Sequence, residues 1–130
     1  MRLNQVTVSA RDLGDSIAFY RTLGLKLIVR SDHYARFECE DGGSTFSLHL
    51  DPNAKSVSET TIYFENDDLD DAVGALKAKG LVFDADPVDQ PWLWREAHLR
   101  DPTGNRICLY HAGKIRRFPP WRLSQAESSK

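Results

Sequence analysis

The chain has 130 residues, 41% of them hydrophobic and 28% charged, which fits one domain with a buried core and argues against general disorder. Its formal net charge of −2 argues against a nucleic-acid-binding protein, because such proteins need a basic surface. No apolar run approaches the roughly 18 residues of a membrane span. The first six residues alternate polar and apolar side chains, unlike a signal peptide. We therefore expect a cytoplasmic protein that binds neither nucleic acid nor a membrane.

The two cysteines, Cys39 and Cys108, lie in runs with the alternation of β-strands. The sequence has neither a Cys-x-x-Cys pair nor the spacing of a zinc finger. Because no export signal is evident and structural disulfides belong to oxidising compartments, two reduced thiols are expected.

An internal repeat with an offset of 56 positions is the main feature of the sequence. Residues 12, 13, 15, 24 and 25 (Asp, Leu, Asp, Gly and Leu) recur unchanged at 68, 69, 71, 80 and 81. Apolar side chains follow each aspartate with helical spacing, so a helix is predicted in each copy. Asp12 and Asp68 suit the N-caps of these helices, and Gly24 and Gly80 suit the left-handed residue that ends a helix.

Alternating polar and apolar residues predict four strands around each helix. In the first copy they cover residues 5–9, 25–30, 33–40 and 44–50, and in the second 61–65, 81–84, 92–100 and 105–111. The predicted fold class is α+β: two βαβββ modules with facing curved mixed sheets and helices on the outer faces. One domain covers residues 1–112, with module one at 1–51 and module two at 58–112, and residues 113–130 form an extended C-terminal tail.

The alternation also assigns the two faces of each sheet. One face carries the apolar set that the helices should cover: Val6, Val8, Phe46, Leu48, Leu50, Ile62, Phe64, Ile107 and Leu109. The other face carries Gln5, Thr7, Ser47, His49, Thr61, Tyr63, Glu65, Cys108 and Tyr110. In a single sheet this second face would simply be solvated, whereas between two facing sheets it lines a cleft for a polar or aromatic small molecule.

Several stretches resemble the vicinal oxygen chelate superfamily, which includes glyoxalase I, bleomycin-resistance proteins, fosfomycin-resistance enzymes and extradiol dioxygenases. The resemblance rests on residues 8–20, on Leu23-Gly24-Leu25, on residues 62–80 and on Asp101-Pro102-Thr103-Gly104-Asn105 before the last strand. With the connecting strands it spans residues 3–112. It implies the paired βαβββ fold and, as in most relatives, a homodimer.

Metal-binding members of this superfamily place ligands on the first and last strands of each module. The resemblance maps these positions onto Gln5, Ser47, Thr61 and Cys108. Serine and threonine hydroxyls are poor ligands for transition metals, and one thiolate with one amide does not make a site. We therefore expect no metal at these positions and no cofactor. The alternative is a displaced site for a divalent metal such as Zn, Ni, Mn or Fe, formed by neighbouring groups such as His49, Glu65, Glu96 and His98.

The predicted ligand site lies on the cleft-facing set, above all at His49, Tyr63, Glu65 and Trp94. It is completed by Gln5, Thr61, Cys108, Tyr110 and Arg36. Trp94 suits stacking on a planar ligand, and Arg36 or Arg95 suits an anionic group. Packing at a module or dimer boundary is an equal alternative for the tryptophan. In the tail, Phe118 and Trp121 are expected to pack on the domain or on a partner.

Three functions remain open from the sequence. The first is a metal-independent small-molecule binding protein of sequestering or resistance type. The second is a lyase, isomerase or dioxygenase that works through an unusual metal site. The third is a structural or interaction protein whose cleft is filled by Tyr63, Trp94 and Tyr110. The sequence favours the first function and identifies neither the ligand nor a reaction.

Overall fold

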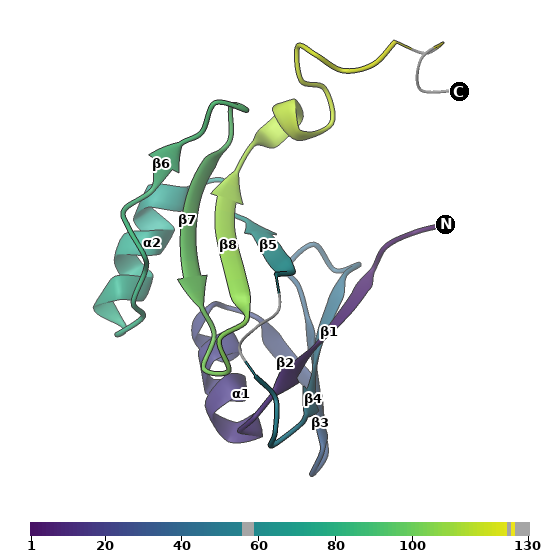
Figure 1. Cartoon of the computed structure of the whole chain (residues 1–130), viewed down its shortest axis with the longest axis vertical. Coiled ribbons are helices and arrows are strands. Elements are labelled where there is room, and N and C mark those ends of the chain that lie inside the picture. The colour runs from purple at the N-terminus through teal and green to yellow at the C-terminus, as the bar shows by residue number, and fades with distance from the viewer. Residues whose placement is uncertain (56–58, 125, 127–130) are drawn as a thin grey trace.

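The chain folds as two modules with the element order βαβββ, seen in a computed structural model that describes residues 1–55, 59–124 and 126 (Figure 1). Module one consists of β1 (Gln5–Ala10), α1 (Leu13–Thr22), β2 (Lys26–Arg30), β3 (Tyr34–Glu38) and β4 (Thr45–Leu50). Module two consists of β5 (Thr61–Glu65), α2 (Leu69–Ala78), β6 (Val88–Asp89), β7 (Arg95–Arg100) and β8 (Arg106–His111). A short 3₁₀ turn, η1 (Gly113–Arg116), follows β8.

Each module forms a four-stranded mixed sheet with the same topology. The strand orders are β1-β4-β3-β2 and β5-β8-β7-β6, and in each sheet the first strand pairs in parallel with the last strand of its module. The other pairs are antiparallel. The predicted fold class is therefore confirmed. No helix in the described part of the chain has the length and apolar character that a membrane crossing requires.

The repeated residues at the helix ends explain where both helices stop, and only in part where they start. Gly24 and Gly80 have positive φ angles of 104° and 97°, which glycine adopts without the steric cost that other residues incur. The Asp12 carboxylate accepts a hydrogen bond of 2.8 Å from the Asp15 backbone N–H, as an N-cap should. Asp68 also occupies the predicted N-cap position of α2, but its side chain makes no capping hydrogen bond.

The second module departs from the predicted strands at two places. Residues 81–84 form one isolated bridge, Phe83 with Leu99, and the regular strand β6 comes later. Pro87 has no N–H to donate, so a ladder cannot run on from residue 84. The strand predicted from residue 92 begins at Arg95 instead, because residues 90–94 make a turn in which Leu93 has a φ of 71°.

The predicted apolar face is confirmed, and it makes a single core from both modules. All nine of its side chains pack in one cluster with buried residues of α1 and α2. Phe46 of β4 and Phe64 of β5 touch edge to face across the module boundary, with ring centroids 5.7 Å apart. The helix-covered faces of both sheets therefore contribute to one core, and the polar faces are left outside it.

Polar contacts beside the core also join the modules. The Tyr20 hydroxyl of α1 donates to the buried Asp101 carboxylate at 2.6 Å. Thr103 Oγ1 accepts from the Arg11 N–H at 3.0 Å, and the Asn105 side-chain amide donates to the Ser9 carbonyl at 2.9 Å. The turn before β8 is thus fixed against α1 and the end of β1.

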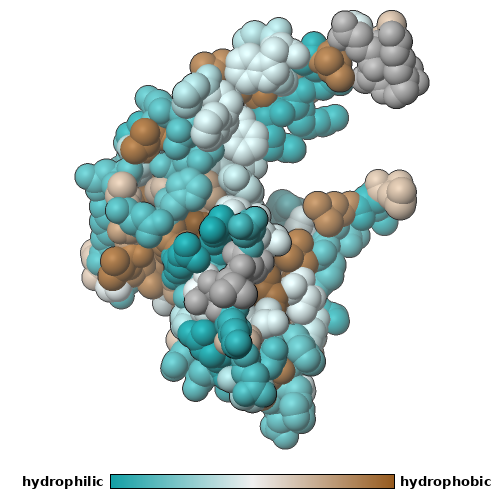
Figure 2. Space-filling model, viewed as in Figure 1, coloured by the Kyte–Doolittle hydropathy of each residue, from teal (hydrophilic) through white to brown (hydrophobic). Residues whose placement is uncertain are grey.

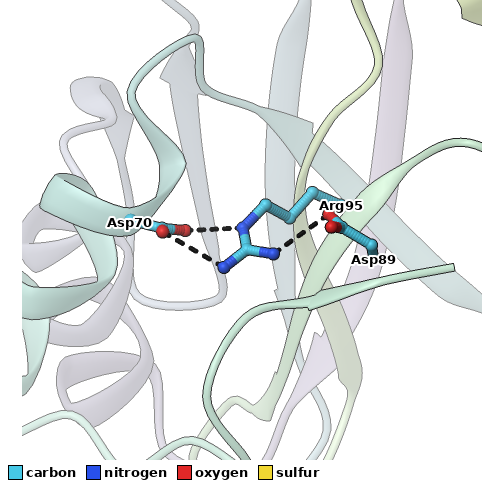
Figure 3. Close-up of polar contacts among 3 residues, drawn as sticks. All are labelled: Asp70, Asp89 and Arg95. Atoms are coloured by element: carbon cyan, nitrogen blue, oxygen red, sulfur yellow. Dashed lines mark hydrogen bonds and ion pairs between the residues drawn. The ribbon is translucent and has the colours of Figure 1, made fainter.

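Arg95 at the start of β7 ties α2 to the outer strands of the second sheet (Figure 3). Its guanidinium donates to both oxygens of Asp70 at 2.8 and 3.1 Å and to Asp89 at 3.0 Å. Two carboxylates therefore already neutralise this cation, and it does not have the free charge that binding of an anionic ligand requires.

The C-terminal tail leaves β8 through η1 and projects from the side away from the helices, as does the N-terminal segment (Figure 1). Figure 2 shows the surface hollowed between these two segments. Phe118 and Trp121 are 56% and 57% exposed, so within the chain they do not pack on the domain as expected. The Arg122 guanidinium lies 4.5 Å from the centre of the Phe118 ring. Residues 56–58, 125 and 127–130 lie outside the described residues.

Replacing Tyr20 with phenylalanine tests the joint between the modules. The variant Tyr20→Phe removes one donor from a buried carboxylate, which should lower the free energy of unfolding by about 1–3 kcal/mol. Urea unfolding measures this change, and Arg21→Ala, at an exposed position of α1, serves as a control with little effect. Equal stability of Tyr20→Phe and the parent protein would contradict the proposed role of this contact.

Candidate functional site

The pairing of the strands places three polar residues of each module at equivalent positions. Ser47 of β4 lies opposite Arg36 of β3, with Tyr34 two residues before it. In the second module Cys108 of β8 lies opposite His98 of β7, with Glu96 two residues before it. The two sets, Tyr34–Arg36–Ser47 and Glu96–His98–Cys108, therefore occupy the same places on the polar faces of the two sheets.

In the first module these residues form a hydrogen-bonded set that uses its own donors and acceptors. Gln5 Nε2 donates to Ser47 Oγ at 2.6 Å, and the Tyr34 hydroxyl lies 2.5 Å from the same oxygen. Arg36 Nε donates to the Tyr34 hydroxyl at 2.9 Å, and Gln5 Oε1 accepts from Thr45. Burial alone would raise the pKa of the Tyr34 phenol, but hydrogen bonds with Ser47 and Arg36 lower it overall.

In the second module the equivalent residues form a cluster of a different chemical kind. Glu96 is 4% exposed, and its two oxygens are held separately: Oε1 lies 2.9 Å from His98 Nε2, and Oε2 accepts from Trp92 Nε1 at 2.7 Å. The Cys108 sulfur is fully buried and lies 3.8 Å from His98 Nε2. Burial, with the Glu96 charge as a second cause, raises the pKa of the Cys108 thiol to about 12.

Three aromatic rings lie beside this cluster on the same face. Trp94 stacks on Tyr110 with ring centroids 4.8 Å apart, and Tyr63 meets both rings edge to face at 5.9 and 5.6 Å. We call this group the aromatic platform. Tyr110 is almost fully buried, whereas Tyr63 keeps 48% of its surface exposed. Burial raises the pKa of both tyrosines, so their hydroxyls stay protonated at neutral pH.

The four residues predicted to line one cleft, His49, Tyr63, Glu65 and Trp94, lie at three separate places in the structure. Tyr63 and Trp94 are brought together in the aromatic platform. Glu65 ends β5, where its carboxylate accepts the N–H groups of Ala112 and Gly113, both at 2.8 Å. These bonds outweigh the effect of burial and lower the pKa of the Glu65 carboxyl. His49 lies exposed on β4 of the other sheet.

The metal positions that the resemblance implies do not fit a metal ion in this chain. Gln5 and Ser47 lie on the first sheet and are hydrogen-bonded to each other, while Thr61 and Cys108 lie on the second. An amide, two hydroxyls and one thiol lack the carboxylates and imidazoles that transition metals require. A different group in the second module, Glu96, His98 and Cys108, brings one ligand atom from each residue within 4.8 Å of the others.

Sequence reasoning placed Glu96 and His98 on the same face but missed their link to Cys108 and to Trp92. The link to Cys108 has a sequence signal, because the turn at residues 101–105 fixes the register in which His98 pairs with Cys108. The link to Trp92 has no such signal, since it depends on the turn at residues 90–94, of which residues 92–94 were predicted as strand.

Comparisons with known proteins agree with this fold. The sequence profile of the Glyoxalase/Bleomycin resistance protein/Dioxygenase superfamily matches residues 2–109. An uncharacterized protein from Mycolicibacterium smegmatis is 30% identical over 109 residues, which cover 83% of this chain and 91% of that protein. The chain therefore belongs to the Glyoxalase/Bleomycin resistance protein/Dioxygenase superfamily.

Solved structures show the same fold at lower sequence identity. The crystal structure of a bleomycin-binding protein in complex with bleomycin is 21% identical, with a TM-score of 0.72 over 86% of this chain and 98% of that one. A lactoylglutathione lyase from Agrobacterium tumefaciens is 22% identical, with a TM-score of 0.72 over 90% of this chain and 97% of that one. The neighbours thus include both a binding protein and an enzyme, so the fold alone does not decide between these functions.

The two thiols should differ in reactivity. With a pKa of about 12, only ~10⁻⁴ of Cys108 is thiolate at pH 8, and the side chain is also buried. In chelator-containing buffer, a disulfide reagent should modify the partly exposed Cys39 slowly and Cys108 only after denaturation. The reagent releases one coloured thiol for each cysteine modified, and its absorbance over time, compared between the parent and Cys39→Ser, measures this order. Fast modification of native Cys39→Ser would contradict the burial of Cys108.

Proposed function

We propose that this protein binds a planar aromatic small molecule on the polar face of its second sheet, and acts by holding that molecule rather than by transforming it. The observation that carries the proposal is the aromatic platform with an exposed ring at its edge. Trp94 and Tyr110 fix each other by stacking, and Tyr63 stands at right angles to both with nearly half of its surface free. A rigid platform of this kind binds flat ligands with little loss of side-chain entropy.

Groups around the platform support a binding role. Glu96 and His98 offer polar contacts at one edge, and His98 is partly exposed. A space of about 250 Å³ opens beside them, lined also by Asp84, Asp86 and Gln90. Polar groups that converge next to an aromatic surface are typical of small-molecule sites. The bleomycin-binding structural neighbour makes bleomycin a suitable first probe.

A second candidate function is that of an interaction protein, and the same rings favour it. The three rings contact one another, so part of the space between them is filled by side chains of the chain itself. In that case the platform stabilises the sheet and forms part of an interface with a protein partner, such as a second copy of the chain in the expected homodimer. Exposed Trp121 and Phe118 in the tail are consistent with such a partner.

Ligand binding separates these two functions. Thermal shift with bleomycin and a panel of flat aromatic compounds should find binders that raise the melting temperature. For those binders, Tyr63→Ala should weaken the affinity by roughly tenfold, the effect of losing one aromatic contact worth about 1.4 kcal/mol. Trp94→Ala should weaken it further.

Trp121→Ala, which makes the same change in the tail, is the matched control and should bind as the parent does. Binding by Tyr63→Ala and Trp94→Ala at the parent's affinity would contradict the proposed site. If no compound in the panel binds while Trp94→Ala shifts the monomer–dimer equilibrium, the interaction function is supported instead.

A further inference from the structure

The cluster of Glu96, His98 and Cys108 contains the three kinds of side chain that bind transition metals, all on the second sheet. From this geometry we propose that these residues form a binding site for a divalent transition metal, Zn²⁺ above all. Two of its three ligands lie on β7, away from the first and last strands that supply ligands in the resemblance noted above. The proposal does not depend on the aromatic platform binding a ligand.

The distances between the ligand atoms suit a small tetrahedral ion. His98 Nε2 lies 2.9 Å from Glu96 Oε1 and 3.8 Å from the Cys108 sulfur, and all three atoms lie within 4.8 Å of one another. Zinc bonds of about 2.0–2.3 Å place neighbouring ligand atoms about 3.3–3.6 Å apart. The observed separations lie on both sides of this range, so small side-chain shifts would bring all three atoms to one ion.

The donor set selects the class of metal. A thiolate and an imidazole favour Zn²⁺ and similar ions over Mg²⁺ and Ca²⁺, which prefer oxygen ligands. The carboxylate and the thiolate together balance the charge of a divalent ion, so binding leaves no net charge buried at the site. Glu96 and Cys108 are buried, whereas 42% of the His98 side chain is exposed, so an ion has a path from solvent.

Trp92 holds the carboxylate in the orientation that metal binding needs. Its indole N–H donates to Glu96 Oε2 and leaves Oε1 directed at His98. Contacts of this kind from outside the ligand set orient ligating carboxylates in known metal sites. Three protein ligands would leave a fourth position on a tetrahedral ion. Two of the three, Glu96 and His98, also line the space of about 250 Å³. An open fourth position is typical of zinc sites that bind water or a substrate.

The first module provides an internal comparison. At the equivalent positions it has Tyr34, Arg36 and Ser47, which are joined to one another by hydrogen bonds. The Arg36 side chain is always positively charged and has no atom that can bind a metal ion. The second module has metal-binding side chains at all three positions. Packing of the sheet does not require this set, because the first module builds the same topology without it.

Metal titration of the untagged protein tests the proposal directly. After dialysis against a chelator, the protein should bind one equivalent of Zn²⁺ by calorimetry. Co²⁺ should bind in its place and give the absorption bands of a tetrahedral site, including a sulfur-to-cobalt charge-transfer band. Cys108→Ser should abolish the charge-transfer band, and His98→Gln should weaken Zn²⁺ binding at least roughly tenfold.

Cys39→Ser and His49→Gln remove the same residue types elsewhere and should bind both metals as the parent does. His98→Gln keeps a hydrogen-bonding partner for Glu96 at a partly exposed position, so it tests the site even if Cys108→Ser fails to fold. The proposal is overturned if the parent binds no stoichiometric Zn²⁺, or if His98→Gln binds it with unchanged affinity. Neither result affects the binding of aromatic ligands to the platform, because the titration contains no such ligand.

Discussion

The buried carboxylate of Asp101 is the constraint on which the arrangement of the two modules depends. It accepts hydrogen bonds from the Tyr20 hydroxyl at 2.6 Å, from the N–H groups of Thr103 and Asn105 at 2.9 Å, and from the Asn105 side chain at 2.8 Å. A buried charge is strongly unfavourable unless it is paired in this way. One donor comes from α1 of the first module, and the others come from the turn before β8 of the second. The buried carboxylate is therefore fully hydrogen-bonded only in the orientation of the modules that brings α1 to this turn.

That orientation decides which surfaces remain for function. The helix-covered faces of the sheets merge into one core, and the polar faces are left outside it. The corresponding turn of the first module also has a carboxylate, Asp41, which accepts the N–H groups of Gly43 and Ser44 but stays exposed. The two modules therefore share a topology and differ in role. The first satisfies its polar face internally, whereas the second combines an aromatic platform with a buried carboxylate, a histidine and a thiol.

Most of the fold could be predicted from the sequence, because the repeat aligns helix ends and sheet faces in both copies. Gly24 and Gly80 marked the helix ends correctly, and alternation assigned the core face without error. The site could be predicted only in part. The alternation of side chains along a strand placed Tyr63 and Trp94 on one face. This alternation carries no information about which strands are neighbours. His49 was grouped with them because the polar faces of the two sheets were expected to line one cleft, but it lies exposed on β4 of the first sheet, outside the aromatic platform.

The central claim is that the polar face of the second sheet is the functional face. The three tryptophans report on it directly, since Trp94 belongs to the platform, Trp92 contacts Glu96 and Trp121 lies in the tail. Two-dimensional ¹H–¹⁵N NMR resolves their indole N–H signals during a titration with bleomycin. We expect the Trp94 signal to move most, the Trp92 signal to move less and the Trp121 signal to stay in place. An unmoved Trp94 signal at saturation, or movement of Trp121 alone, would contradict this account.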